Sequence, residues 1–158
     1  MIIQTLDTYV NIEEVRLVGS DENYLETNHQ IATYLLRKGY ELFRDYKVSN
    51  EDLHNALWLE KRSMHELRTL PKNYYINIRL NLVKEVSNDK NFKEMITNFK
   101  ELVYLRLRKI LQLLLINPEA LISRELLSKL TIEEEVLVRF LSQILKEWVN
   151  YVLGITYE

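Results

Sequence analysis

Three histidines, His29, His54 and His65, are the side chains best suited to acid–base or metal chemistry near neutral pH. His54 and His65 are eleven residues apart, so one helix would hold them about 16 Å apart along its axis, too far to share a metal ion. None of the three stands in an HExxH or catalytic-triad motif. We therefore interpret the histidines as structural and expect neither a metal nor a cofactor.

Three consecutive carboxylates, Glu133, Glu134 and Glu135, are a second candidate for metal binding. They follow Thr131 at the predicted start of a helix, where negative charge is favoured for structural reasons, and Thr131 and Glu134 have the spacing of a capping box. The chain has no GxxxxGK or GxGxxG phosphate loop, and its three glycines are scattered. The sequence therefore predicts a protein that is not an enzyme.

Basic and aromatic residues on the predicted helices are candidates for partner contacts. Guanidinium groups near Tyr104 would suit a phosphate or an acidic partner, although a solvated helix face is an equal alternative. Aromatic residues in such helices, Trp148 included, anchor cores and protein interfaces more often than they stack on bases. The candidate interface residues are Trp58, Tyr74, Tyr75, Tyr104, Arg106, Arg108 and Lys109.

The composition limits the class of protein. A hydrophobic share of 47% with 28% charged residues is typical of a folded globular chain, and the formal charge of −2 gives no overall attraction to nucleic acid, so any DNA contact would be local. There is no cysteine for disulfides or thiolate chemistry, and no signal peptide is recognised. The longest apolar run, residues 113–116, is far shorter than the ~20 residues of a membrane span. We expect a cytoplasmic protein that does not enter the membrane.

Long helices must position the candidate residues from Ser49 onward, because only two prolines interrupt the chain. Ser49 is a candidate N-cap for a helix that ends at Pro71. Further helices are predicted over residues 73–86 and 92–116, as a shorter piece after Pro118, and from Thr131 to about Gly154. Residues 110–116 are apolar nearly all round and are predicted to be the deepest part of the core.

The first part of the chain has a different pattern. Strands are predicted at residues 1–6, 14–18 and 40–43, with a turn at 19–21 and a helix that begins after Thr27 and ends at Gly39. The expected fold class is therefore mainly α: a bundle of about five helices, residues 49–158, preceded by a small mixed α/β domain, residues 1–48.

Several segments resemble one family in order and spacing. Residues 58–62 (WLEKR) and 67–75 (LRTLPKNYY) are similar to the helix and the following leucine-proline motif of the GINS helical domain. Residues 105–111 (LRLRKIL) and 130–135 (LTIEEE) are similar to two later helix motifs of that domain. The resemblance covers about residues 53–153, along five predicted helices.

The order of the parts resembles one archaeal subclass of GINS subunits, in which the small domain comes first and which corresponds to eukaryotic subunits two and three. Residues 31–39 (IATYLLRKG) are similar to the helix of that leading domain, whereas residues 26–28 (ETN) replace a proline common in the family. The resemblance implies a non-catalytic replication scaffold that forms a 2:2 heterotetramer with a sister GINS subunit. It also implies binding to the MCM helicase, as in CMG-type assemblies, to a RecJ-like protein and to primase, at the nucleoid.

Other classes remain open at the level of sequence. A small HEPN-like nuclease would need a more widely spaced arginine and histidine than Arg62 and His65, and a helical DNA-binding regulator would need a basic recognition helix. A dimeric structural protein is a further alternative. If the chain is a GINS subunit, we expect the helices of residues 49–116 to contact the sister subunit, with Trp58, Tyr75 and Tyr104 as anchors.

Overall fold

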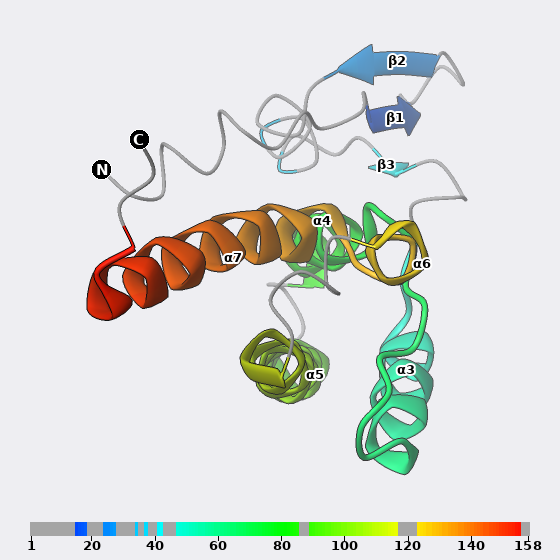
Figure 1. The fold of residues 1–158 in the computed structure, drawn as a ribbon. Helices are drawn as coiled ribbons and strands as arrows, with labels where there is room; N and C mark the ends of the chain where they lie inside the picture. Colours follow the sequence, from blue (N-terminus) through cyan, green and yellow to red (C-terminus); the bar gives the residue numbers. More distant parts are fainter. Residues whose placement is uncertain are drawn as a thin grey trace.

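The computed structural model describes residues 15–18, 24–27, 34, 37, 41–42, 47–85, 89–116 and 123–155. Five helices lie within these residues, which confirms the prediction of a mainly helical protein. Figure 1 shows α5 end-on, with α3 beside it and α7 crossing it and extending away. The helices are α3 (Asn50–Arg62), α4 (Tyr74–Glu85), α5 (Asp89–Ile116), α6 (Arg124–Leu127) and α7 (Ile132–Leu153).

Three short strands precede the helices: β1 (Val15–Val18), β2 (Tyr24–Thr27) and β3 (Glu41–Leu42). They form an antiparallel sheet in the order β2-β1-β3. β1 and β3 fall where strands are predicted, whereas β2 is not predicted. The predicted strand at residues 1–6, the turn at 19–21 and His29 lie outside the described residues, and of the predicted first helix only Tyr34 and Arg37 are described, both helical.

Helix α3 begins with a full capping box. The Ser49 hydroxyl accepts from the Asp52 amide at 3.0 Å, and the Asp52 carboxylate accepts from the Ser49 amide at 2.9 Å. The Ser49 hydroxyl also donates to the Asp52 carboxylate at 2.6 Å, and this bond, followed by the one from the Ser49 amide, lowers the pKa of Asp52 because both favour the ionised carboxyl group. The Ser49 cap is therefore confirmed, but the predicted end at Pro71 is wrong, since the helix ends at Arg62.

The segment between α3 and α4, residues 63–73, leaves the helix because tertiary contacts satisfy its polar groups. The amide of Leu70 donates to the carbonyl of Lys129 at 3.2 Å, and the amide of Ile132 donates to the carbonyl of Lys72 at 3.0 Å. Leu67 and Leu70 turn into the core on either side of this contact. Burial of both leucines and the two hydrogen bonds together outweigh about two and a half further turns of helix, which sequence periodicity alone favours.

Capping residues also fix the ends of α7. Thr131 and Glu134 form the predicted capping box, with the Glu134 carboxylate accepting from the Thr131 amide at 3.0 Å. At the other end Gly154 adopts the left-handed conformation, with φ 68°, and its amide donates to carbonyls of the last turn. A residue with a side chain would be strained there, so glycine sets the end of the helix.

The core consists of two apolar clusters along α5. The first joins α3, α4 and the first half of α5 around Leu57, Ile78 and Leu102. The second joins the second half of α5 to α7 around Leu114, Leu130 and Val138, with Leu67 from the connecting segment. The prediction that residues 110–116 are the deepest core is wrong for half of the segment. Ile110 and Leu114 are buried, whereas Leu111, Leu115 and Ile116 are exposed.

Tyr74 provides a test of this core, because its buried hydroxyl has no hydrogen-bond partner among the described residues. We expect Tyr74→Phe to change the free energy of unfolding by less than about 1 kcal/mol, in the stabilising direction, since no hydrogen bond is lost. Burial, with the charge of Asp52, raises the pKa of Tyr74 to about 12.

The wild-type chain should therefore lose stability between pH 10 and 12, where the unfolded tyrosine ionises and the folded one does not. Urea denaturation at pH 7 and at pH 11 should show a smaller alkaline loss for Tyr74→Phe than for wild type. An equal loss in both proteins would contradict the assignment of this pH dependence to Tyr74.

Candidate protein-interaction site

Four charged side chains are buried where the two apolar clusters meet, and we call them the ionic cluster. Glu60 comes from α3, Arg106 and Lys109 from α5, and Glu134 from the first turn of α7. Arg106 lies four residues after Leu102 and four before Ile110, so it continues the buried face of α5 between the two apolar clusters. The two cations balance the two carboxylates.

Arg106 uses all five of its N–H donors. Nε and Nη2 make a bidentate pair with the Glu134 carboxylate at 2.7 and 2.8 Å, and Nη1 donates to Glu60 at 2.8 Å. The two remaining donors reach the carbonyls of Arg68 at 2.7 Å and Lys129 at 3.1 Å. The guanidinium therefore connects α3, the segment of residues 63–73, the turn before α7, and α7 itself.

Lys109 is equally well satisfied. Its Nζ donates to the Glu60 carboxylate at 2.6 Å and to the carbonyls of Glu60 at 2.7 Å and Glu66 at 3.0 Å. Those carbonyls lie at and just beyond the C-terminal end of α3, where a positive charge is favourable. The ammonium therefore replaces the helical hydrogen bonds that α3 gives up by ending at Arg62.

Glu134 completes the ionic cluster from the side of α7. Besides Arg106 it accepts from the Tyr75 hydroxyl at 2.5 Å, so α4 is joined to the same group. Burial, followed by the charge and hydrogen bond of Glu134, raises the pKa of Tyr75 well above its ordinary value. Burial alone would lower the pKa of Arg106, but hydrogen bonding and charge from Glu134 hold it above its ordinary value. Tyr75 therefore remains a neutral donor and Arg106 a cation.

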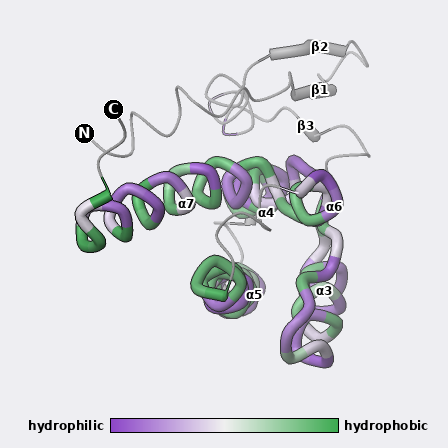
Figure 2. Tube along the Cα trace, in the orientation of Figure 1, coloured by the Kyte–Doolittle hydropathy of each residue, from purple (hydrophilic) through white to green (hydrophobic). Residues whose placement is uncertain are grey.

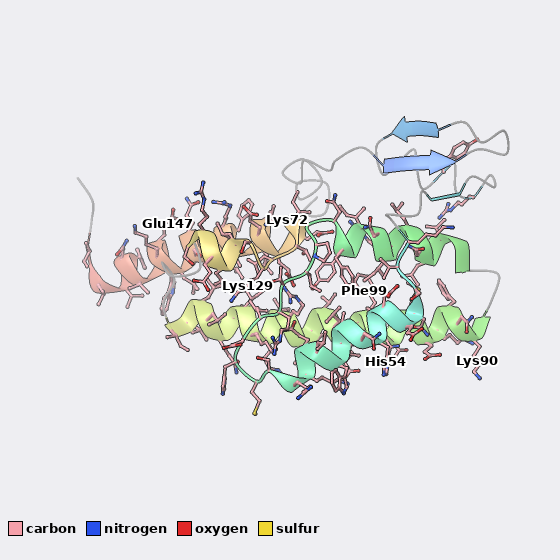
Figure 3. The ribbon with its side chains drawn as sticks, turned by 90° about the vertical axis from the view of Figure 1, so that its right-hand side faces the viewer. His54, Lys72, Lys90, Phe99, Lys129 and Glu147 are labelled. Carbon is pink, nitrogen blue, oxygen red and sulfur yellow. The ribbon has the colours of Figure 1, made fainter. Side chains whose placement is uncertain are left out.

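The other carboxylates of the EEE run bind different cations. Glu133 pairs with Arg79 at 3.2 Å, and Glu135 pairs with Lys72 at 2.8 Å and with Arg139 at 2.7 Å. Figure 3 shows Lys72 close to α7 and near Lys129. The three consecutive carboxylates thus contact three separate groups of partners. This is a structural role, as the sequence predicts, and not that of a metal site.

Four of the candidate interface residues lie inside the chain. Tyr74, Tyr75, Arg106 and Lys109 are all buried, and the last three donate hydrogen bonds to acidic residues of the chain itself. Their side chains are therefore not available as direct contacts on the surface. The acidic partner that Arg106 and Lys109 suggest in the sequence is provided by α3 and α7.

The other three candidates, Trp58 on α3 and Tyr104 and Arg108 on α5, lie on two helices that pack together, and we call them the α3–α5 surface. All three are exposed, Trp58 by 51% and Tyr104 by 60%. The Arg62 guanidinium lies over the Trp58 ring, 4.8 Å from its centroid, and a 2.6 Å ion pair between Lys61 and Glu101 connects the two helices beside them. Exposed tryptophan, tyrosine and arginine are the residue types most enriched at the energetic centres of protein interfaces.

A second exposed surface, along the outer half of α7, is not predicted. The apolar positions of this helix have helical spacing, and among them only Trp148 is considered as a core or interface anchor from the sequence. In the structure Phe140, Ile144 and Trp148 are exposed, while Val138 is buried and Leu141 packs against the core. Figure 2 shows apolar segments continuing to the far end of α7, beyond its contact with α5. The sequence does contain a signal of this surface. The apolar residues of the helix cover a wider arc around its axis than one buried face requires.

Neither described histidine, His54 or His65, belongs to the ionic cluster. His54 is exposed on the outer side of α3 (Figure 3), and His65 follows the helix instead of sharing it. In the part of the chain that the structure describes, no cluster of histidine and acidic residues could hold a metal ion. Nor does any described helix combine the length and apolar character that crossing a membrane requires.

Comparison with known proteins agrees with this geometry. A family model described as Sld5, GINS complex protein helical bundle domain, matches residues 9–153. No curated protein matches the sequence. The matched region includes α3 to α7, the ionic cluster and both exposed surfaces.

The ionic cluster predicts a large difference between two arginines on the same helix. Arg106→Met leaves Glu134 without its cation and Glu60 with Lys109 alone, which should lower the free energy of unfolding by about 3–5 kcal/mol. Arg108→Met, two residues further on and exposed, should change it by less than about 0.5 kcal/mol. Urea denaturation followed by circular dichroism measures both.

If Arg106→Met does not fold, Arg106→Lys gives a second measurement. It keeps the charge but cannot make the five hydrogen bonds, so an intermediate loss of stability is expected. Equal stability of the Arg106 and Arg108 variants would show that the ionic cluster does not hold the fold together.

Proposed function

The chain belongs to the GINS family of DNA-replication proteins, whose members form hetero-oligomeric complexes, and we propose that it is a non-catalytic scaffold subunit within such a complex. The family match over residues 9–153 is the observation that carries this proposal. The structure supports a scaffold role because the ionic cluster fixes the helices relative to one another, and the outward faces carry residue types suited to protein contacts.

Within the family, the chain is a member of the archaeal subclass of GINS subunits in which the small domain comes first. Residues 1–48 form that small mixed α/β domain, and residues 49–158 form the helical domain. Two observations support this assignment. The strands β1 to β3 precede the helices in the chain, and residues 31–39 are similar to the helix of the leading domain.

The proposed assembly is a 2:2 heterotetramer with a sister GINS subunit. The assembly supports the MCM helicase in a CMG-type complex and links it to a RecJ-like protein and to primase, at the nucleoid in the cytoplasm. We infer these partners from the family resemblance. A general attraction to DNA is not part of the proposal, because the formal charge is −2 and Arg106 and Lys109 are neutralised inside the chain.

The α3–α5 surface is the proposed contact with the sister subunit. Trp58 and Tyr104 supply broad, rigid contact areas at low cost in conformational entropy, and Arg108 adds directed hydrogen bonds. The Arg62 guanidinium already lies on Trp58, so one face of the ring is held in place before a partner binds. This residue set replaces the predicted anchors Trp58, Tyr75 and Tyr104, because Tyr75 is buried.

Co-purification tests the proposed contact. Alanine at Trp58, Tyr104 and Arg108 together should weaken binding to the sister GINS subunit at least about 100-fold, since truncating interface centres costs about 2 kcal/mol or more each. All three side chains are exposed, so circular dichroism should show an unchanged fold.

A matched control changes Lys90, Glu94 and Lys100 to alanine, which are exposed residues of the same helix α5. Binding of this control should stay near that of wild type. If the first triple variant binds as tightly as the control, the α3–α5 surface is not the contact.

A further inference from the structure

The outer half of α7 carries a line of exposed apolar residues, which we call the α7 stripe: Ile144, Trp148, Tyr151 and Val152. Each is at least half exposed, Trp148 by 61% and Tyr151 by 85%. Their spacings of three and four residues place them on one side of the helix. This line lies next to the buried face that Val138 and Ser142 direct into the protein.

The stripe is large for an unpartnered surface. Its four residues expose on the order of 500 Å² of mostly apolar area, within the range of the largest patch on a typical monomer. Two copies of the stripe would together bury roughly 1,000 Å², the lower bound for a specific interface. The exposed area is therefore sufficient for a specific protein contact.

Charge is almost absent from this part of the helix. Between residues 140 and 155 only Lys146 and Glu147 are charged, and they project about 200° and 100° away from Trp148 around the helix axis. Glu147 accepts from the Gln143 side chain at 2.9 Å and lies on the side of α7 away from α5 (Figure 3). Such a polar face lacks the lysines and arginines of a helix that binds anionic membranes, which favours a protein partner.

We propose that the α7 stripe binds the α7 stripe of a second copy of this chain, with the two helices antiparallel about Trp148. A symmetric dimer requires a surface that is complementary to itself. Trp148 lies midway between Ile144 and Val152, four residues from each. An antiparallel pair therefore places Trp148 against Trp148 and Ile144 against Val152 of the other copy, with no charged residue of either helix on the line of contact.

This dimer goes beyond the proposed function and does not depend on it. It needs only the chain itself, so it should form in the absence of any sister subunit. It is compatible with a 2:2 assembly, in which two copies of the chain are present and each needs more than one interface. The α3–α5 surface, on other helices, would remain available for the sister subunit.

Light scattering coupled to size-exclusion chromatography tests the proposal on the full chain alone. Wild type should be a dimer at tens of micromolar, and Trp148→Glu should raise the dimer dissociation constant at least about 100-fold by placing two charges at the centre of the contact. Trp58→Glu is the matched control, a comparably exposed tryptophan on α3, and should remain a dimer. Circular dichroism checks that both variants are folded.

Wild type that is monomeric at these concentrations, or a Trp148→Glu chain that remains dimeric, would overturn the proposal. The proposed function has a separate readout, which is binding of the wild-type chain to the sister subunit. A wild-type chain that dimerises but does not bind the sister subunit would count against the scaffold assignment alone.

Cross-linking tests the antiparallel arrangement, since the natural chain has no cysteine. A mixture of Ile144→Cys and Val152→Cys chains should form disulfide-linked dimers under mild oxidation, because an antiparallel pair brings these positions opposite each other. Each variant alone should cross-link much less. Efficient self-linking of either variant alone would indicate parallel helices and contradict the arrangement.

Discussion

The structure depends on a buried set of charges that must be neutralised completely. Arg106 and Lys109 are buried with Glu60 and Glu134, and each unsatisfied charge in such a place would cost several kcal/mol. All eight N–H donors of the two cations have partners within hydrogen-bonding distance. These partners come from α3, the connecting segment and α7, so only one relative placement of the helices satisfies the whole set. The apolar clusters on either side supply burial, whereas the ionic cluster supplies the specific arrangement.

This arrangement separates the interior from the interaction surfaces. Two of the three cations that could have bound phosphate or an acidic peptide, Arg106 and Lys109, are used internally, and α4 joins them through Tyr75. Two outward surfaces remain, and they differ in chemistry. The α3–α5 surface combines aromatic rings with arginine, as hetero-complexes often do, whereas the α7 stripe is almost entirely apolar. A chain whose helices are held rigidly while two distinct surfaces face outward is well suited to connecting several partners at once.

Local signals in the sequence predict the helices well, but they predict poorly those helix ends that depend on tertiary contacts. Ser49 and Thr131 are correctly predicted as N-caps, and the predicted helix of residues 73–86 differs from α4 by one residue at each end. Capping and periodicity act over a few neighbouring residues, so they can be recognised without the fold. The end of α3 at Arg62 cannot be recognised in this way. It depends on Lys109, nearly fifty residues away, binding the carbonyls that the shortened helix exposes.

The sequence by itself determined the mainly helical class, the caps and the family resemblance. Only the tertiary structure decided which cations are inside, because Arg106 and Arg108 are neighbours on one helix with the same chemistry. A turn of about 200° separates them, and what each meets depends on helices distant in the chain. The same reason explains the α7 stripe. Periodicity shows that a helix face is apolar, but whether the face meets its own core or a second molecule depends on how far the neighbouring helix extends.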